Sequence, residues 1–188
     1  MTMQRYPWFQ EAAKVIFEVA KDMKDCVVCL KVHPIDVPLD VYRRIAQRLG
    51  ATNVRFFEEQ FGELLAACDV LIGGSSTTVL EAILMGRRTI CINFTDEPDR
   101  YPYVADGGSL GARSAGQLRA ALDKVFSPEA QEELEAGRRA FLERHAAPSA
   151  DGEGSDTFVQ MLLARLRRED RDADFPAVLP PSTIRSAD

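Results

Sequence analysis

Apolar residues follow two kinds of spacing along most of this chain. Short unbroken apolar runs, too short for helices, predict strands; they lie at Cys26–Val32, Asn53–Phe57, Val70–Ile72 and Thr89–Asn93. Between these runs apolar residues recur every three or four positions, which predicts helices with one buried face. The predicted helices are Trp8–Lys21, Asp40–Leu49, Phe61–Cys68, a helix from Thr77 that ends at Gly86, Ser114–Phe126 and Pro128–His145.

This alternation of strands and helices predicts an α/β fold, a Rossmann-like three-layer domain with a mostly parallel sheet. The domain is expected to span residues 1–168, closing with a helix from Ser155 to Arg167. Residues 169–188 are charged and contain prolines, and we expect them to form a disordered tail. The segment Phe94–Gly111 is predicted to be a loop, and loops of this length in compact domains are usually functional or flexible. Its acidic residues are either simply solvated or paired for acid–base chemistry; they are Asp96, Glu97 and Asp99.

Composition narrows the classes of partner. The 188 residues are 46% hydrophobic and 28% charged, which is enough apolar material for a core. A net charge of −6 argues against binding to nucleic acid or to an anionic membrane. The chain holds no apolar run of the ~20 residues that a transmembrane helix needs. Residues 1–6 lack the apolar core of a signal peptide, so we expect a cytoplasmic location.

The four cysteines are Cys26, Cys29, Cys68 and Cys91. Cys26 and Cys29 have C-x-x-C spacing, but within a strand residues three apart point to opposite faces. The two thiols therefore cannot coordinate one metal ion, and we expect no metal site. The run Cys26–Val32 shows no alternation, which predicts a strand covered on both faces. We expect all four cysteines to be small buried hydrophobic residues of a reducing compartment.

The stretch from Asp69 to Glu81 has the pattern of an anion-binding turn. After the predicted strand come two glycines and two serines, which are Gly73, Gly74, Ser75 and Ser76. The glycines permit a tight turn, and either serine can cap the helix that begins at Thr77. A strand, a glycine turn and a helix start together favour phosphate. Glu81 lies one helical turn after Thr77, where its carboxylate can accept hydrogen bonds from a sugar diol. The alternative is a well-capped core helix with an exposed glutamate.

A second candidate segment, Lys31–Pro34, follows the first predicted strand. Lys31 and His33 are two residues apart and therefore share a face. His33 is either a ligand-binding residue or a histidine that bonds a local carbonyl at the strand end. Because ligands of parallel sheets bind at the carboxyl ends of strands, the positions of the two candidate segments agree.

The two segments together resemble a known group of enzymes. Lys31-Val32-His33-Pro34 resembles the K-x-H-P motif of bacterial surface-glycan transferases, which include teichoic acid glycerophosphotransferases, capsule-forming transferases and bacterial sialyltransferases. The Ser75–Thr77 turn with Glu81-Ala82 resembles their second nucleotide-binding motif. It is also similar to the S-G-G-x-x-E-E-A segment of UDP-N-acetylglucosamine 2-epimerases. All of these share the GT-B architecture of two Rossmann-like domains, and this chain has about the size of the C-terminal half.

The resemblance implies roles for individual residues. His33 would hydrogen-bond the nucleotide phosphate and take part in catalysis, with Lys31 supporting it and Pro34 following. Glu81 would hold the ribose hydroxyls. The turn and helix start would hold phosphate oxygens through Gly73, Gly74, Ser75, Ser76 and Thr77. The resemblance implies a CDP-, CMP- or UDP-linked donor as substrate, with no metal ion and no further cofactor.

The resemblance also implies partners. These transferases place the catalytic base in an acceptor-binding half, so a separate acceptor half is expected. Residues 1–7 do not supply the strand that the family has before its first helix. The resulting open sheet edge predicts a homodimer or strand exchange. The expected function is the nucleotide-sugar-binding domain of a GT-B glycosyltransferase for bacterial surface polysaccharide. The alternatives are a UDP-N-acetylglucosamine 2-epimerase-like enzyme and a non-catalytic nucleotide-binding module.

Overall fold

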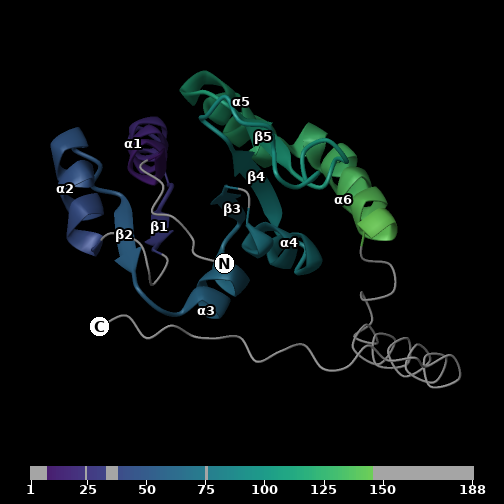
Figure 1. Cartoon of the computed structure of the whole chain (residues 1–188), viewed down its shortest axis with the longest axis horizontal. Coiled ribbons are helices and arrows are strands. Elements are labelled where there is room, and N and C mark those ends of the chain that lie inside the picture. Colours follow the sequence, from purple (N-terminus) through teal and green to yellow (C-terminus); the bar gives the residue numbers. More distant parts are fainter. Residues whose placement is uncertain (1–7, 24, 33–37, 75, 146–188) are drawn as a thin grey trace, which may run out of the picture. The chain divides into compact units, whose positions relative to one another are not determined.

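The computed structural model describes residues 8–23, 25–32, 38–74 and 76–145, with the backbone alone at Trp8 (Figure 1). Helices and strands alternate, which confirms the α/β class. In chain order the elements are α1 (Trp8–Ala20), β1 (Val28–Lys31), α2 (Leu39–Leu49), β2 (Val54–Phe57), α3 (Phe61–Ala67), β3 (Val70–Gly73), α4 (Thr77–Leu84), β4 (Arg88–Ile92), β5 (Leu110–Ala112), α5 (Ala115–Phe126), a 3-10 turn (Pro128–Ala130) and α6 (Gln131–His145).

The strands form two small sheets rather than one, and every pairing is parallel. In one sheet β1 pairs with β2, placing Lys31 opposite Phe57. In the other, β4 lies between β3 and β5. Within the residues described, β1 and β3 share no ladder. Helix α1 belongs to both cores, because Ala12 and Val19 pack with the β3–β4–β5 sheet and Ala13 and Phe17 pack with the β1–β2 sheet.

Three layers result from this packing. Helices α1, α2 and α5 cover one side of the strands. On the other side of β3 and β4 lies a third cluster that includes α4, α6 and Tyr103. Helix α1 buries more than the single face predicted for it. Ala13, Phe17 and Ala20 are buried, whereas Phe9 is 39% exposed. Ala12 and Val19 are buried as well, since the helix meets two sheets rather than one.

The expectation for the first strand is wrong at Cys29. Strand β1 is shorter than predicted, and its side chains alternate: Val28 and Leu30 pack toward α1 and α2, while Cys29 is exposed. Val27, just before the strand, is 60% exposed. Among the described residues, the helices therefore cover one face of the β1–β2 pair and not the other. The other three cysteines are only partly buried, and burial raises the pKa of each thiol; they are Cys26, Cys68 and Cys91.

Two further boundaries differ from the prediction. The predicted loop Phe94–Gly111 ends in a strand, β5, which pairs with Ile90–Ile92 of β4. The predicted helix Pro128–His145 begins as the 3-10 turn and continues as α6. The remaining predicted elements are confirmed to within about two residues, including the end of α2 at Gly50 in a left-handed conformation. The helix predicted at 155–167, the tail and residues 1–7 lie outside the described residues, so those expectations and the homodimer stay predictions.

Several contacts fix helix α6 to the rest of the fold, and those with α4 and with the loop before β5 lie along Phe141, Arg138, Arg144 and His145. Phe141 is buried against Tyr103, with ring centroids 5.8 Å apart. The Arg138 guanidinium donates to the Ile83 carbonyl at the end of α4, at 3.2 Å. Asp106, in the loop before β5, accepts from Arg144 at 2.8 Å and contacts His145 Nε2 at 2.6 Å. These contacts hold the loop between β4 and β5 under α6.

The position of Phe17 generates a stability prediction. Its side chain is fully buried and meets Phe56 edge to face, with centroids 6.4 Å apart. We expect Phe17→Ala to lower the free energy of unfolding by about 3–5 kcal/mol, because the lost ring leaves a cavity between α1 and the β1–β2 sheet. Urea denaturation measures this loss. Phe126→Ala removes the same ring where it is 47% exposed, and an equally large loss there would contradict the assignment of α1 as the shared core helix.

Asp106 generates a prediction about pH. The hydrogen bond with His145, and more weakly the charge of Arg144, hold the pKa of the Asp106 carboxyl below its usual value. A carboxyl with a lower pKa in the folded chain stabilises it above its unfolded pKa, and this stabilisation is lost as the pH falls through the folded pKa. We therefore expect Asp106→Asn to reduce the loss of stability between about pH 6 and about pH 3 in urea denaturation. Asp123→Asn, at an exposed position of α5, should leave that loss unchanged.

Candidate functional site

The predicted strand–turn–helix between Val70 and Glu81 is confirmed. Strand β3 ends at Gly73 and α4 begins at Thr77. Ser76 is the N-cap: its Oγ accepts from the Thr78 N–H at 3.3 Å and from the Thr78 hydroxyl at 3.0 Å. Ser75, the other candidate cap, lies outside the described residues. The start of α4 therefore has the cap and the dipole orientation of an anion-binding helix start.

Gly73 is favoured by packing and not by an unusual backbone angle. A Cβ at this position would lie 3.2 Å from Cγ2 of Val79, which is fully buried. A side chain at this strand end would therefore fit only if Val79, in the first turn of α4, shifted by a few tenths of an ångström. Gly74 follows in the turn and is half-buried. This close approach fixes the position of the α4 start relative to the carboxyl end of β3.

Thr77 and Glu81 lie on the exposed side of α4, one turn apart. The opposite side is fully buried and packs in the third cluster through Val79 and Ile83. Leu84 is 43% exposed and lies at the end of the helix. Within the described part of the chain the Glu81 carboxylate has no hydrogen-bond or ion-pair partner, so it is available to a ligand.

Lys31 is the last residue of β1, half-buried. His33 and Pro34 lie outside the described residues. The structure thus brings Gly73, Gly74, Ser76, Thr77 and Glu81 into one turn and helix start, and it places Lys31 at the carboxyl end of a strand in the other sheet.

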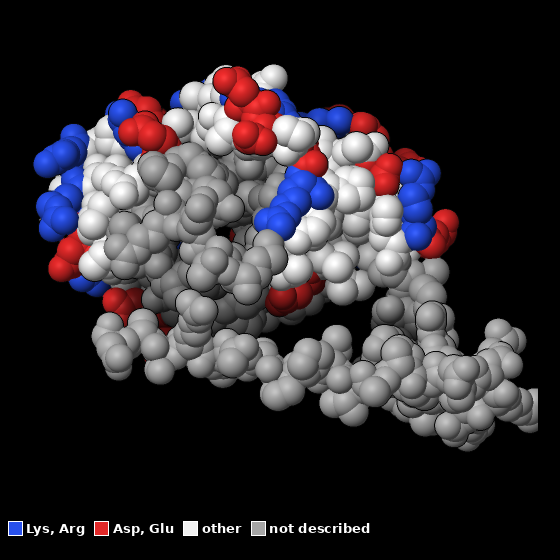
Figure 2. Space-filling view, viewed as in Figure 1, with Lys and Arg blue, Asp and Glu red and all other residues white. Residues whose placement is uncertain are grey.

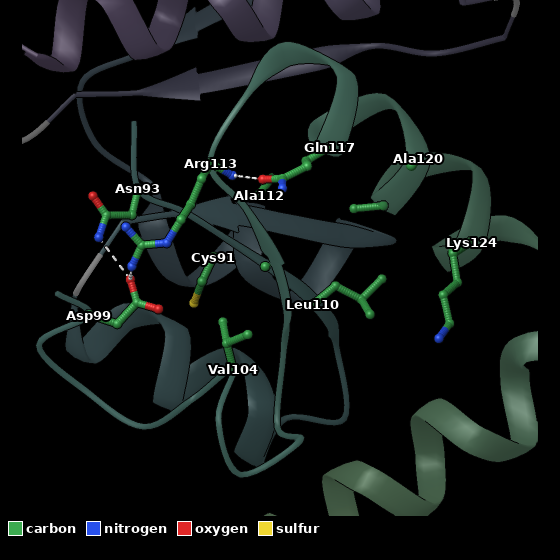
Figure 3. Close-up of a pocket in the computed structure, with 12 residues that line it drawn as sticks. Cys91, Asn93, Asp99, Val104, Leu110, Ala112, Arg113, Gln117, Ala120 and Lys124 are labelled. Atoms are coloured by element: carbon green, nitrogen blue, oxygen red, sulfur yellow. Dashed lines mark hydrogen bonds and ion pairs between the residues drawn. The ribbon is translucent and has the colours of Figure 1, made fainter. Parts of the chain in front are cut away.

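A cavity of about 430 Å³ lies elsewhere, at the edge of the second sheet beside β5 (Figure 3). Strand, loop and α5 residues line it together. They are Cys91, Asn93, Asp99, Val104, Leu110, Gly111, Ala112, Arg113, Gln117, Ala120, Ala121 and Lys124. None of the residues predicted for nucleotide binding is among them. The sequence pattern did not predict this cavity, because the segment that forms β5 was predicted to be part of a loop.

One end of the cavity is a polar network that holds the acidic loop after β4 (Figure 3). Asp99 Oδ1 accepts from Asn93 Nδ2 and from the Arg113 guanidinium, both at 2.8 Å. Arg113 also donates to the carbonyls of Thr95 and Glu97, at 3.3 and 3.2 Å. The Asp99 carboxylate is therefore already paired, and the other two acidic residues of the loop, Asp96 and Glu97, are exposed. The carboxylates fit the solvated alternative better than paired acid–base chemistry. The sequence signal for the network was Asn93, which directly follows an apolar strand, whereas no local pattern marks Arg113 because β5 was not predicted.

The surface and the composition of the described residues add three observations. Lys and Arg side chains are interspersed with Asp and Glu on the face drawn in Figure 2. No helix in the described ranges has both the length and the apolar character needed to cross a membrane. Among the same residues no three His, Cys, Asp or Glu side chains gather as a metal site requires.

Comparisons with models of known protein families, with curated proteins and with solved structures found no match.

The Ser76 cap generates a prediction. We expect Ser76→Ala to destabilise the chain by about 1 kcal/mol, because the Thr78 N–H loses its acceptor at the start of α4. Ser76→Asp supplies a carboxylate oxygen in the same place and should retain most of the stability. Urea denaturation compares the two variants. Equal losses for alanine and aspartate would show that the Ser76 side chain does not act as a cap.

Proposed function

We propose that this chain is the nucleotide-sugar-binding domain of a GT-B glycosyltransferase acting in bacterial surface polysaccharide synthesis. One observation supports it above the others: both predicted binding segments follow the carboxyl ends of parallel strands, β1 and β3. Strand β2 pairs with β1 in one sheet, and in the other β3 pairs with β4, which pairs with β5. Figure 1 shows β1 and β3 between these outer strands. Ligands of open α/β sheets bind in the crevice outside the carboxyl ends of their strands.

The start of α4 supplies the proposed phosphate contact. Backbone N–H groups of a first helical turn and the helix dipole attract anions. Ser76 organises this turn, and the exposed hydroxyl of Thr77 adds a donor. The Glu81 carboxylate, on the same exposed side, accepts hydrogen bonds from the ribose hydroxyls. In this proposal Lys31 and His33 complete the phosphate contacts from the end of β1.

Catalysis by such a domain consists of stabilising the charge that develops on the departing nucleotide phosphate. Fixed donors at the phosphate lower the energy of the transition state because they need no reorganisation during the reaction. His33 is the proposed catalytic donor in this domain. The acceptor and the catalytic base are proposed to come from a separate acceptor-binding half.

Calorimetric titration tests the proposal. We expect one of CMP, CDP, UDP or UDP-N-acetylglucosamine to bind the wild-type chain. His33→Ala should weaken that binding by about 1.5–3 kcal/mol, the range for a hydrogen bond to a charged group. His145→Ala changes the other histidine of the chain, at the end of α6, and should leave the affinity unchanged. Equal effects of the two substitutions would contradict the phosphate role of His33.

The same titration with a 2′-deoxy nucleotide tests Glu81. If the carboxylate accepts the ribose 2′-hydroxyl, the deoxy ligand should bind more weakly to the wild type but not to Glu81→Gln, because the two changes remove the same interaction. Independent losses would place the ribose elsewhere. Production of an epimer from UDP-N-acetylglucosamine would favour the epimerase-like alternative. Binding without either reaction, even with an acceptor-binding half present, would favour the non-catalytic module.

A further inference from the structure

Strand β5 presents one open peptide group to the cavity beside it. The Asn93 N–H donates to the Ala112 carbonyl at 3.0 Å, so Ala112 faces β4. Along a strand the backbone N–H and C=O groups of successive residues point to opposite sides. Gly111, the residue before Ala112, therefore directs both its N–H and its C=O away from β4. Gly111 also lines the cavity.

The positions on either side of Gly111 are already occupied. The Ser109 N–H donates to the Tyr103 carbonyl at 2.9 Å, and the Arg113 N–H donates to Gln117 Oε1 at 2.6 Å. Gly111 itself has no partner on its outer side among the residues described. An added peptide strand needs a run of open backbone groups. A single donor and acceptor, closed off at both ends, suits a compact ligand instead.

The walls of the cavity favour a flat, apolar ring. On one side Val104 lies so close that a Cβ on Gly111 would be 2.9 Å from Val104 Cγ1. On the other side stand the small side chains of Ala120 and Ala121 from α5. The volume of about 430 Å³ lies within the range of small-molecule sites.

The charges at the two ends of the cavity are paired. Arg113 bonds Asp99 at 2.8 Å, and Lys124 bonds Glu133 at 2.9 Å. An anionic ligand would have to compete with these carboxylates for the cations. The cavity therefore fits a neutral ligand better than a charged one.

We propose that this cavity binds a neutral planar ring that carries an adjacent N–H and C=O on one edge, as a pyrimidine base such as uracil does. The Gly111 N–H donates to the ring carbonyl, and the Gly111 carbonyl accepts from the ring N–H. The ring lies between Val104 and the alanines of α5. This site shares no residue with the proposed nucleotide-phosphate site and does not depend on it.

The test is an NMR titration of the isotope-labelled full chain, followed at the Gly111 amide. Uracil should shift this resonance in a saturable way. The matched ligand 1,3-dimethyluracil keeps the ring but has no N–H, and we expect it to bind at least about tenfold more weakly because one hydrogen bond is lost. No shift at Gly111 with uracil, or equal affinity for both compounds, would overturn the proposal.

A pair of substitutions on α5 locates the ligand. Ala120→Leu fills the cavity from its exposed wall and should abolish the uracil shift at Gly111. Ala115→Leu makes the same change at an exposed position of α5 that does not line the cavity, and it should leave the shift in place. Retention of the shift in Ala120→Leu would overturn the proposal. So would tighter binding of a short extended peptide than of uracil, because that outcome would assign the β5 edge to strand addition.

Discussion

The structure depends on a helix that serves two hydrophobic cores. Strands β1 and β3 share no ladder within the described residues, so backbone hydrogen bonds do not join the two sheets there. Helix α1 joins the two sheets through side-chain packing. Its neighbouring residues Ala12 and Ala13 belong to different cores, and Ile16 contacts both cores. Asn53 reinforces the join, because its Nδ2 donates to the carbonyls of Ala20 and Cys26 at 2.9 and 3.0 Å. The end of α1 and the approach to β1 are thereby held together.

This arrangement bears on any ligand that meets the ends of both β1 and β3. A continuous sheet would fix those ends through a ladder, whereas here their relation rests on side-chain packing around Phe17 and Ile16. Packing of this kind is sensitive to small changes of volume. The α4 start is fixed differently, by the contact of Gly73 with Val79 and by the Ser76 cap. Half of the proposed nucleotide site is thus locally determined, and the other half depends on α1.

The sequence predicted features whose physical cause is local. The spacing of apolar residues identified α1 to α5, and the turn before Thr77 identified the capped helix start. It failed where the cause is tertiary. Strand β5 has three residues, one of them glycine, and becomes a strand only because Ile90–Ile92 pair with it. Cys29 resembled a core residue because its run is apolar, but no described element covers that face of β1.

The cavity beside β5 follows from the same distinction. Residues between Cys91 and Lys124 line it together, and no local sequence pattern predicts that they lie close to one another. Yet the residue that makes it possible is visible once β5 is known. Gly111 alone lets Val104 lie against the strand while its peptide group stays open, because any Cβ would meet the valine at 2.9 Å. In a sheet edge this short, one glycine decides whether Val104 can lie against the strand.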